Sequence, residues 1–230
     1  MVVGETGLRM HDLTVATDGQ LVADVALVRR ERAGVFHHHF VTSAHVLPPE
    51  QGGADAPELV VQLRQGQDGW QMRAARLQGQ DGARDLALLR IEGPGGPVLA
   101  LGDSRRVREG DDLAFMGFPI GGVLGFSSVT HRATVSSITV AALPSPSAQR
   151  LTEQAIRGLR AVNFEIFQLD ATAFPGNSGG PLFDPASGVL LGVVSMTLVK
   201  GRRESALSHP SGIVYAVPGR YVKDLLERHR

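Results

Sequence analysis

The sequence contains no cysteine, which excludes disulfide bonds and a thiol nucleophile and leaves no redox signal for a compartment. Its formal net charge at pH 7 is +0 and its arginines are spread along the chain, so we expect no nucleic-acid partner. No apolar run approaches the roughly 20 residues that cross a membrane. Residues 1–20 lack the basic start and apolar core of a signal peptide. We therefore expect no membrane association and a cytoplasmic location, or a periplasmic or secreted one if a leader precedes the chain.

Apolar residues make up 43% of the 230 residues, enough to bury a sizeable core as one or two compact units. Many short apolar runs are separated by Gly, Pro and Asp, a spacing typical of all-β barrels. A charged segment near residues 100–112 divides the expected strands into two sets. They are 21–28, 36–42, 59–63, 70–77, 86–91 and 113–116, then 128–138, 164–169, 190–197 and 213–217.

Two segments have a helical pattern. Residues 221–229 place Val222, Leu225 and Leu226 on one face, which predicts a C-terminal helix. Residues 151–159 are expected to form one or two turns within a loop that starts near residue 144.

The segment PGNSGGP places Ser178 in a glycine-rich turn between two apolar runs. Gly176 permits backbone angles that a side chain would resist, so the amides of Gly176 and Ser178 can converge on one point and hold an oxyanion. Serine is a weak nucleophile and needs a base that is oriented by a third group. Taken alone, the motif is equally compatible with an ordinary turn.

Two candidate partners for the serine lie upstream. His45 follows the apolar run that ends in VTSA, and Asp85 opens the run DLALLRI. Each has an ordinary alternative, because a lone histidine is usually structural and an aspartate before a strand is usually a turn or cap residue. The order His, Asp, Ser along the chain is nevertheless that of the chymotrypsin class. The coincidence of all three, with long β-rich spacers, favours one catalytic site.

These segments, VTSAHVL, DLALLRI and PGNSGGPL, resemble those of trypsin-like serine peptidases, most closely the HtrA/Deg-like branch. LGDS, GFPIG and NFEIFQLDA are also similar to segments of that family, and the resemblance runs from about residue 20 to the C-terminus. It implies an all-β fold with two six-stranded antiparallel β-barrels and a C-terminal helix. We expect one peptidase domain over residues 1–230, with an N-terminal barrel over 1–105, a C-terminal barrel over 106–218 and the helix over 219–230. The active site would lie between the barrels.

The resemblance implies a serine endopeptidase that acts on extended or unfolded polypeptide. Ser178 would attack the carbonyl, His45 would take and return the proton, and Asp85 would fix the imidazole tautomer. Gly176, Asn177 and Ser178 would form the oxyanion hole. Two alternatives remain open: a peptide-binding or scaffold module without turnover, and an esterase with the same triad.

Two features of relatives are not expected here. No residues after Arg230 supply the peptide-binding PDZ domain that many of them append. Trimerisation through N-terminal aromatic residues is not expected, because residues 1–20 contain no Phe, Tyr or Trp, and the oligomeric state is left open.

The resemblance also implies a substrate-binding pocket formed by Thr172, Val194, Ser195 and Met196. Thr172 stands where trypsins carry an aspartate, so we expect cleavage after small to medium apolar side chains. Asn177 offers no charge to a newly freed N-terminus, so activation by N-terminal cleavage is not expected.

The run His37-His38-His39 suggests a metal site, but strand alternation would leave only two of these side chains on one face. Zinc needs three or four ligands. We therefore expect neither a metal nor any other cofactor.

Overall fold

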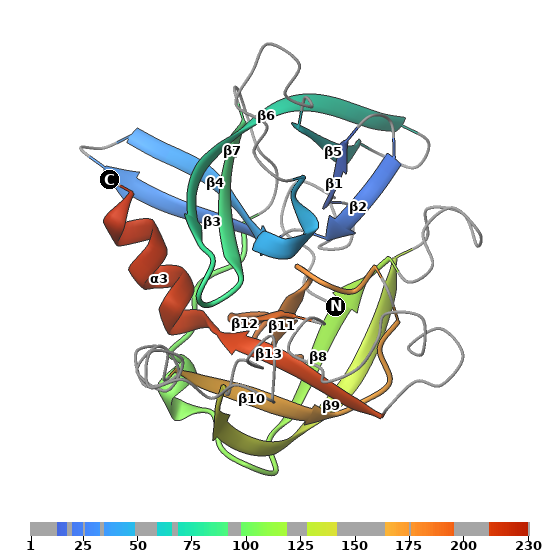
Figure 1. The fold of residues 1–230 in the computed structure, drawn as a ribbon, viewed down its shortest axis with the longest axis vertical. Coiled ribbons are helices and arrows are strands. Elements are labelled where there is room, and N and C mark those ends of the chain that lie inside the picture. Colours follow the sequence, from blue (N-terminus) through green and yellow to red (C-terminus); the bar gives the residue numbers. More distant parts are fainter. Residues whose placement is uncertain are drawn as a thin grey trace, which may run out of the picture.

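The computed structural model describes residues 13–17, 20–24, 26–32, 35–48, 59–65, 69–91, 98–118, 128–141, 164–174, 176–195 and 212–229. These residues form two β-sheets and a C-terminal helix. Figure 1 shows the first sheet above, the second below, and the helix along one side of both.

The first sheet has seven strands in the spatial order β2-β1-β5-β6-β7-β4-β3. Its strands are β1 (Leu13–Thr17), β2 (Gln20–Asp24), β3 (Ala26–Arg32), β4 (Val35–Ser43), β5 (Leu59–Gln65), β6 (Gly69–Asp81) and β7 (Leu86–Ile91). Every residue of β7 except Arg90 is buried, as expected of a short apolar run in the middle of a sheet. β4 and β7 are antiparallel, with Ser43 opposite Leu86. The end of β4 and the start of β7 therefore meet at one edge of the sheet.

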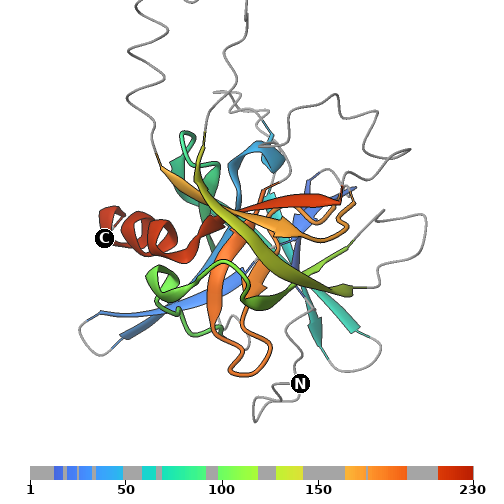
Figure 2. The ribbon, with the colours of Figure 1, turned by 90° about the horizontal axis from the view of Figure 1, so that it is seen from below.

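The second sheet is a closed barrel in the order β10-β13-β12-β11-β8-β9. Its strands are β8 (Asp112–Gly117), β9 (Val129–Val140), β10 (Glu165–Asp170), β11 (Pro181–Phe183), β12 (Leu190–Val194) and β13 (Ile213–Pro218). Figure 2 shows the green, orange and red barrel strands surrounding one interior. Alternate residues such as Ala133 and Val135 fill that interior with Phe115 and Phe167.

A shared apolar cluster joins the two sheets beneath the C-terminal helix, α3 (Gly219–Arg228). It contains Val41 of the first sheet, Val193 of the barrel, and Val222 and Leu225 of the helix, all 0% exposed. Burying a side chain such as Leu225 stabilises the fold by roughly 1.5–3 kcal/mol. The chain between the sheets forms the short helix η2 (Ser104–Arg106), and Ser104 Oγ accepts a 2.9 Å hydrogen bond from the backbone amide of Arg220. These contacts hold the two sheets in one arrangement.

The structure differs from the expected strands in several details. The run 21–28 contributes to two strands, β2 and β3, and β1 and β11 were not predicted. The run 113–116, expected in the first set, is β8 of the second sheet, and the described residues of the first half form a seven-stranded half-barrel sheet instead of a six-stranded barrel. The sequence does carry a signal for β1, because Asp18-Gly19, a common hairpin dipeptide, separates it from β2. The expected helical turns at 151–159 lie outside the described residues.

Candidate active site

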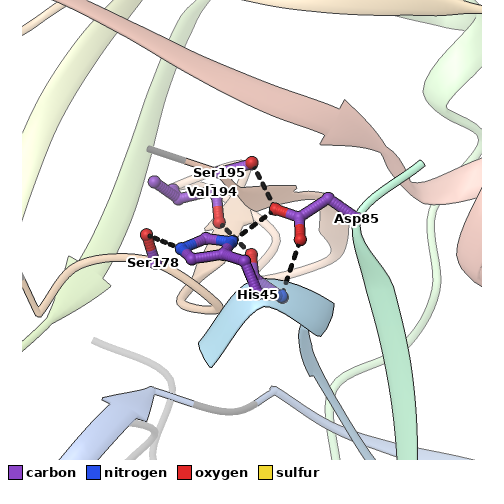
Figure 3. A network of polar contacts seen from close by, with 6 residues as sticks. His45, Asp85, Ser178, Val194 and Ser195 are labelled. Carbon is purple, nitrogen blue, oxygen red and sulfur yellow. Dashed lines mark hydrogen bonds and ion pairs between the residues drawn. The ribbon is translucent and has the colours of Figure 1, made fainter. Parts of the chain in front are cut away.

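The structure brings His45, Asp85 and Ser178 together from three separate segments (Figure 3). His45 Nε2 lies 3.1 Å from Ser178 Oγ, and His45 Nδ1 lies 2.7 Å from Asp85 Oδ2. The imidazole therefore connects the carboxylate to the hydroxyl. All three side chains are largely enclosed, since the exposed fraction is 18% for the His45 side chain, 12% for the Asp85 side chain and 6% for the residue Ser178.

The antiparallel pairing of β4 with β7 explains how His45 and Asp85 meet. His45 lies in the single-turn helix η1 (Ala44–Val46) directly after β4, and Asp85 directly precedes β7. The backbone amide of Ala44 donates to the Asp85 carbonyl at 3.0 Å, and that of His45 donates to Asp85 Oδ1 at 2.8 Å. Asp85 has φ of 55°, a left-handed conformation that aspartate tolerates better than most residues. The turn thus holds both carboxylate oxygens against the histidine segment.

The charge state of Asp85 decides the tautomer of His45. Burial raises the pKa of Asp85, but hydrogen bonds and the interaction with His45, together with a hydrogen bond from Ser195, outweigh burial and hold the pKa below its ordinary value. An ionised carboxylate only accepts hydrogen bonds, so Nδ1 of His45 carries the proton that faces it. In the neutral imidazole Nε2 then presents its lone pair to Ser178.

Ser195 is a fourth member of this network. Its Oγ donates to Asp85 Oδ2 at 2.6 Å, and the residue is 0% exposed. Nearby, Ser43 Oγ donates to the carbonyl of Val194 at 3.0 Å, which ties the end of β12 to the histidine segment. Ser195 was expected in the substrate pocket, and its contact with Asp85 was not predicted. The only local signal is a hydroxyl at the end of a fully buried strand, which needs a partner.

The turn that carries Ser178 has a defined backbone. Gly176 has φ of 106°, where a side chain would be strained. The amide of Asn177 donates to the Phe174 carbonyl at 3.1 Å, and the amide of Gly180 donates to the Asn177 carbonyl at 3.2 Å. Of the three residues assigned to the oxyanion hole, Asn177 thus uses its backbone amide within the turn.

The expected pocket residues lie in different surroundings. Thr172 is exposed, whereas Val194 is 0% exposed and packs in the barrel core. Met196 lies outside the described residues. The described residues therefore do not show these side chains as one pocket wall.

The histidine run lies on β4, and the side chains of His37 and His38 are outside the described part of the structure. Among the side chains that are described, no group of three or more His, Cys, Asp or Glu residues could hold a metal ion. No helix in the described ranges is long and apolar enough to span a membrane.

Comparison with known proteins identifies relatives of the chain. The family model of the trypsin-like peptidase domain matches residues 26–193. The mitochondrial serine protease HTRA2 of Drosophila pseudoobscura pseudoobscura is 33% identical over 188 residues, which are 82% of this chain and 36% of that protein. The serine protease Do-like HtrB of Bacillus subtilis (strain 168) is 28% identical over 191 residues, or 83% of this chain and 35% of that protein. The chain thus spans about a third of the length of these relatives.

A solved structure, the HtrA-type protease AlgW with a decapeptide, has a similar fold. It matches with a TM-score of 0.63 and 23% identity, covering 91% of this chain and 52% of that one. This likeness confirms the expected trypsin-like fold with its C-terminal helix. Because the family model covers well over half of the sequence, the chain belongs to the trypsin-like peptidase family and is homologous to the HtrA/Deg serine proteases.

Proposed function

We propose that the protein is a serine endopeptidase that hydrolyses peptide bonds in extended polypeptide segments. The observation that carries the proposal is the continuous contact from Ser178 Oγ through the two ring nitrogens of His45 to Asp85 Oδ2, at 3.1 and 2.7 Å. Family membership supports the same assignment.

The proposed reaction begins with attack of Ser178 Oγ on the substrate carbonyl. The hydroxyl proton passes to His45 Nε2, which is the unprotonated nitrogen because Asp85 holds the other proton on Nδ1. The resulting imidazolium is stabilised by the ionised Asp85 carboxylate. His45 then protonates the leaving amine. In the second half of the reaction, water attacks the acyl group, His45 takes the proton from that water, and the proton returns to Ser178 Oγ as the acyl group leaves.

The amides of Gly176 and Ser178 are proposed to stabilise the tetrahedral anion. The positive φ of Gly176 supports this assignment, because it permits the amides on either side of Asn177 to converge. Asn177 lies between them and is 0% exposed, so its side chain is packed inside the protein and does not contact solvent.

Polypeptide is the proposed substrate class. AlgW, a neighbour in fold, is described with a bound decapeptide. We also propose a preference for small to medium apolar side chains before the cleaved bond, with Thr172 and Met196 as pocket residues and without Val194, whose side chain is buried in the barrel core. One relative is named as a mitochondrial protease. The cytoplasmic location of this chain therefore stays a prediction.

Casein digestion tests the proposal against its two alternatives. Wild-type protein should cleave unfolded casein, and Ser178→Ala should lower turnover by roughly four to six orders of magnitude while melting at the same temperature. A scaffold module would cleave neither casein nor an activated ester such as p-nitrophenyl acetate. An esterase would hydrolyse the ester and leave casein intact, and either pattern would refute the peptidase assignment.

A further inference from the structure

The turn that carries Ser178 rests on the barrel at three places. The amide of Gly179 donates to the Val194 carbonyl at 2.8 Å. Gly180 packs so closely on β8 that a Cβ atom there would lie 2.1 Å from the carbonyl oxygen of Met116. The third anchor is a side chain, Asn177, and it is the one that a substitution can change without altering the backbone.

Asn177 is completely buried, and its side chain reaches His131 on β9. Its Nδ2 lies 3.4 Å from His131 Nε2. Within the described ranges, its Oδ1 has no hydrogen-bond partner. Burying a side-chain amide without hydrogen-bond partners costs free energy, so the contact with His131 favours this position of the Asn177 side chain.

His131 is itself held in place by β8. It lies opposite Phe115 in the β8–β9 register, and the two rings are stacked with centroids 4.8 Å apart and an interplanar angle of 16°. Phe115 is 0% exposed. Because the His131 ring is stacked on a buried phenylalanine of the paired strand, it provides a rigid support for Asn177.

The neutral form of His131 suits this role. With its proton on Nδ1, the imidazole offers the lone pair of Nε2 to an N–H of Asn177. Burial lowers the pKa of His131, which favours that neutral form. The charged side chains nearby are directed elsewhere: Arg132, the next residue on β9, is exposed, Asp112 on β8 accepts a hydrogen bond from Thr134, and Asp170 on β10 is exposed opposite Thr134.

We propose that His131 is a positioning residue for catalysis, a role that rests on the peptidase activity proposed above. By holding the side-chain amide of Asn177, His131 fixes the backbone between Gly176 and Ser178. That backbone carries both the nucleophile and the amides of the proposed oxyanion hole. Loss of one such amide donor lowers kcat by about 10²- to 10³-fold, and a displacement of about 1 Å by about 10²-fold.

The test compares two substitutions at residue 131. His131→Phe keeps the ring on Phe115 but removes the acceptor for Asn177, so kcat should fall by about 10- to 100-fold with KM nearly unchanged. His131→Gln keeps a hydrogen-bonding side chain within reach of Asn177 and should restore kcat to within about threefold of the wild type. The substrate would be a fluorogenic peptide that spans a casein cleavage site found with the wild-type protein.

Active-site titration with a fluorophosphonate separates positioning from loss of fold. If His131 positions the turn, all His131→Phe molecules react with the probe, but each reacts more slowly. The inference is overturned if kcat of His131→Phe equals that of the wild type. It is also overturned if both variants lose kcat equally, or if the loss follows a smaller number of titratable sites. An inactive wild-type protein would instead refute the proposed function, so the two failures are distinguishable.

Discussion

Asp85→Asn is the substitution whose effect follows most directly from the hydrogen bonds in the site. Oδ1 of Asp85 accepts from the backbone amide of His45 at 2.8 Å, so that atom must remain an oxygen in the variant. The new amide nitrogen then replaces Oδ2, which faces both His45 Nδ1 and Ser195 Oγ, at 2.7 and 2.6 Å. An amide N–H donates, so Nδ1 must become the acceptor.

The heavy atoms stay in place, but the protons are reversed. The proton of the neutral imidazole moves to Nε2, which can no longer accept the hydroxyl proton of Ser178 3.1 Å away. An asparagine in this role lowers kcat by about 10⁴-fold in a serine protease with the same triad, which corresponds to about 5.4 kcal/mol in the activation barrier. We expect a loss of similar size at neutral pH.

The assay is steady-state cleavage of the fluorogenic casein peptide at pH 7.5, with thermal melting of both proteins. Asp184→Asn is the matched control: this aspartate lies in the exposed turn after β11, where it accepts hydrogen bonds from Ser187. Asp184→Asn should keep wild-type kcat. If Asp85→Asn retained more than about a tenth of wild-type kcat while folded, the tautomer argument would be wrong.

Further predictions concern the hydroxyl of Ser195, acid stability and specificity. Ser195→Ala removes a hydrogen bond to a buried carboxylate, worth about 1.5–3 kcal/mol, and should lower kcat by about 10- to 100-fold in the same assay; unchanged kcat would remove Ser195 from the site. The pKa of Asp85 is lowered in the fold, so its stabilising effect is present above the ordinary value of 3.8 and is lost as pH falls through the folded pKa. The lowered pKa of His131 makes stability decline as pH falls below 6.5, because the unfolded chain binds that proton more tightly. Urea melts from pH 7 to 3 should therefore show a smaller decline for His131→Gln between pH 6.5 and 5 and for Asp85→Asn below pH 4, and parallel curves would contradict both. Mass spectrometry of casein digests should place the cuts after apolar residues, whereas a majority after Lys or Arg would show that a carboxylate reaches the pocket.

Local sequence was sufficient to find the three residues that now lie in contact. Ser178, His45 and Asp85 each stand next to an apolar run, and such runs indicate strands without any knowledge of the fold. Their order along the chain then indicates how the strands come together. The C-terminal helix was equally accessible, because Val222, Leu225 and Leu226 follow the helical period.

The contacts that the sequence did not reveal join residues far apart in the chain, and the strand register that brings such residues together cannot be derived from periodicity. Ser195 and Asp85 are 110 positions apart, and Asn177 and His131 are 46 apart. His131 faces Asn177 only because β9 pairs with β8 in the register that sets His131 opposite Phe115. A shift of one residue would direct His131 to the other face of the strand.

The most direct test of the central claim is peptide mapping of the native protein after reaction with a fluorophosphonate. We predict one covalent phosphonyl adduct per chain, on the hydroxyl of Ser178, and a strong reduction of labelling in Asp85→Asn. An adduct on another residue, or labelling of Asp85→Asn at the wild-type rate, would contradict the account of Ser178 as a nucleophile activated by His45 and Asp85.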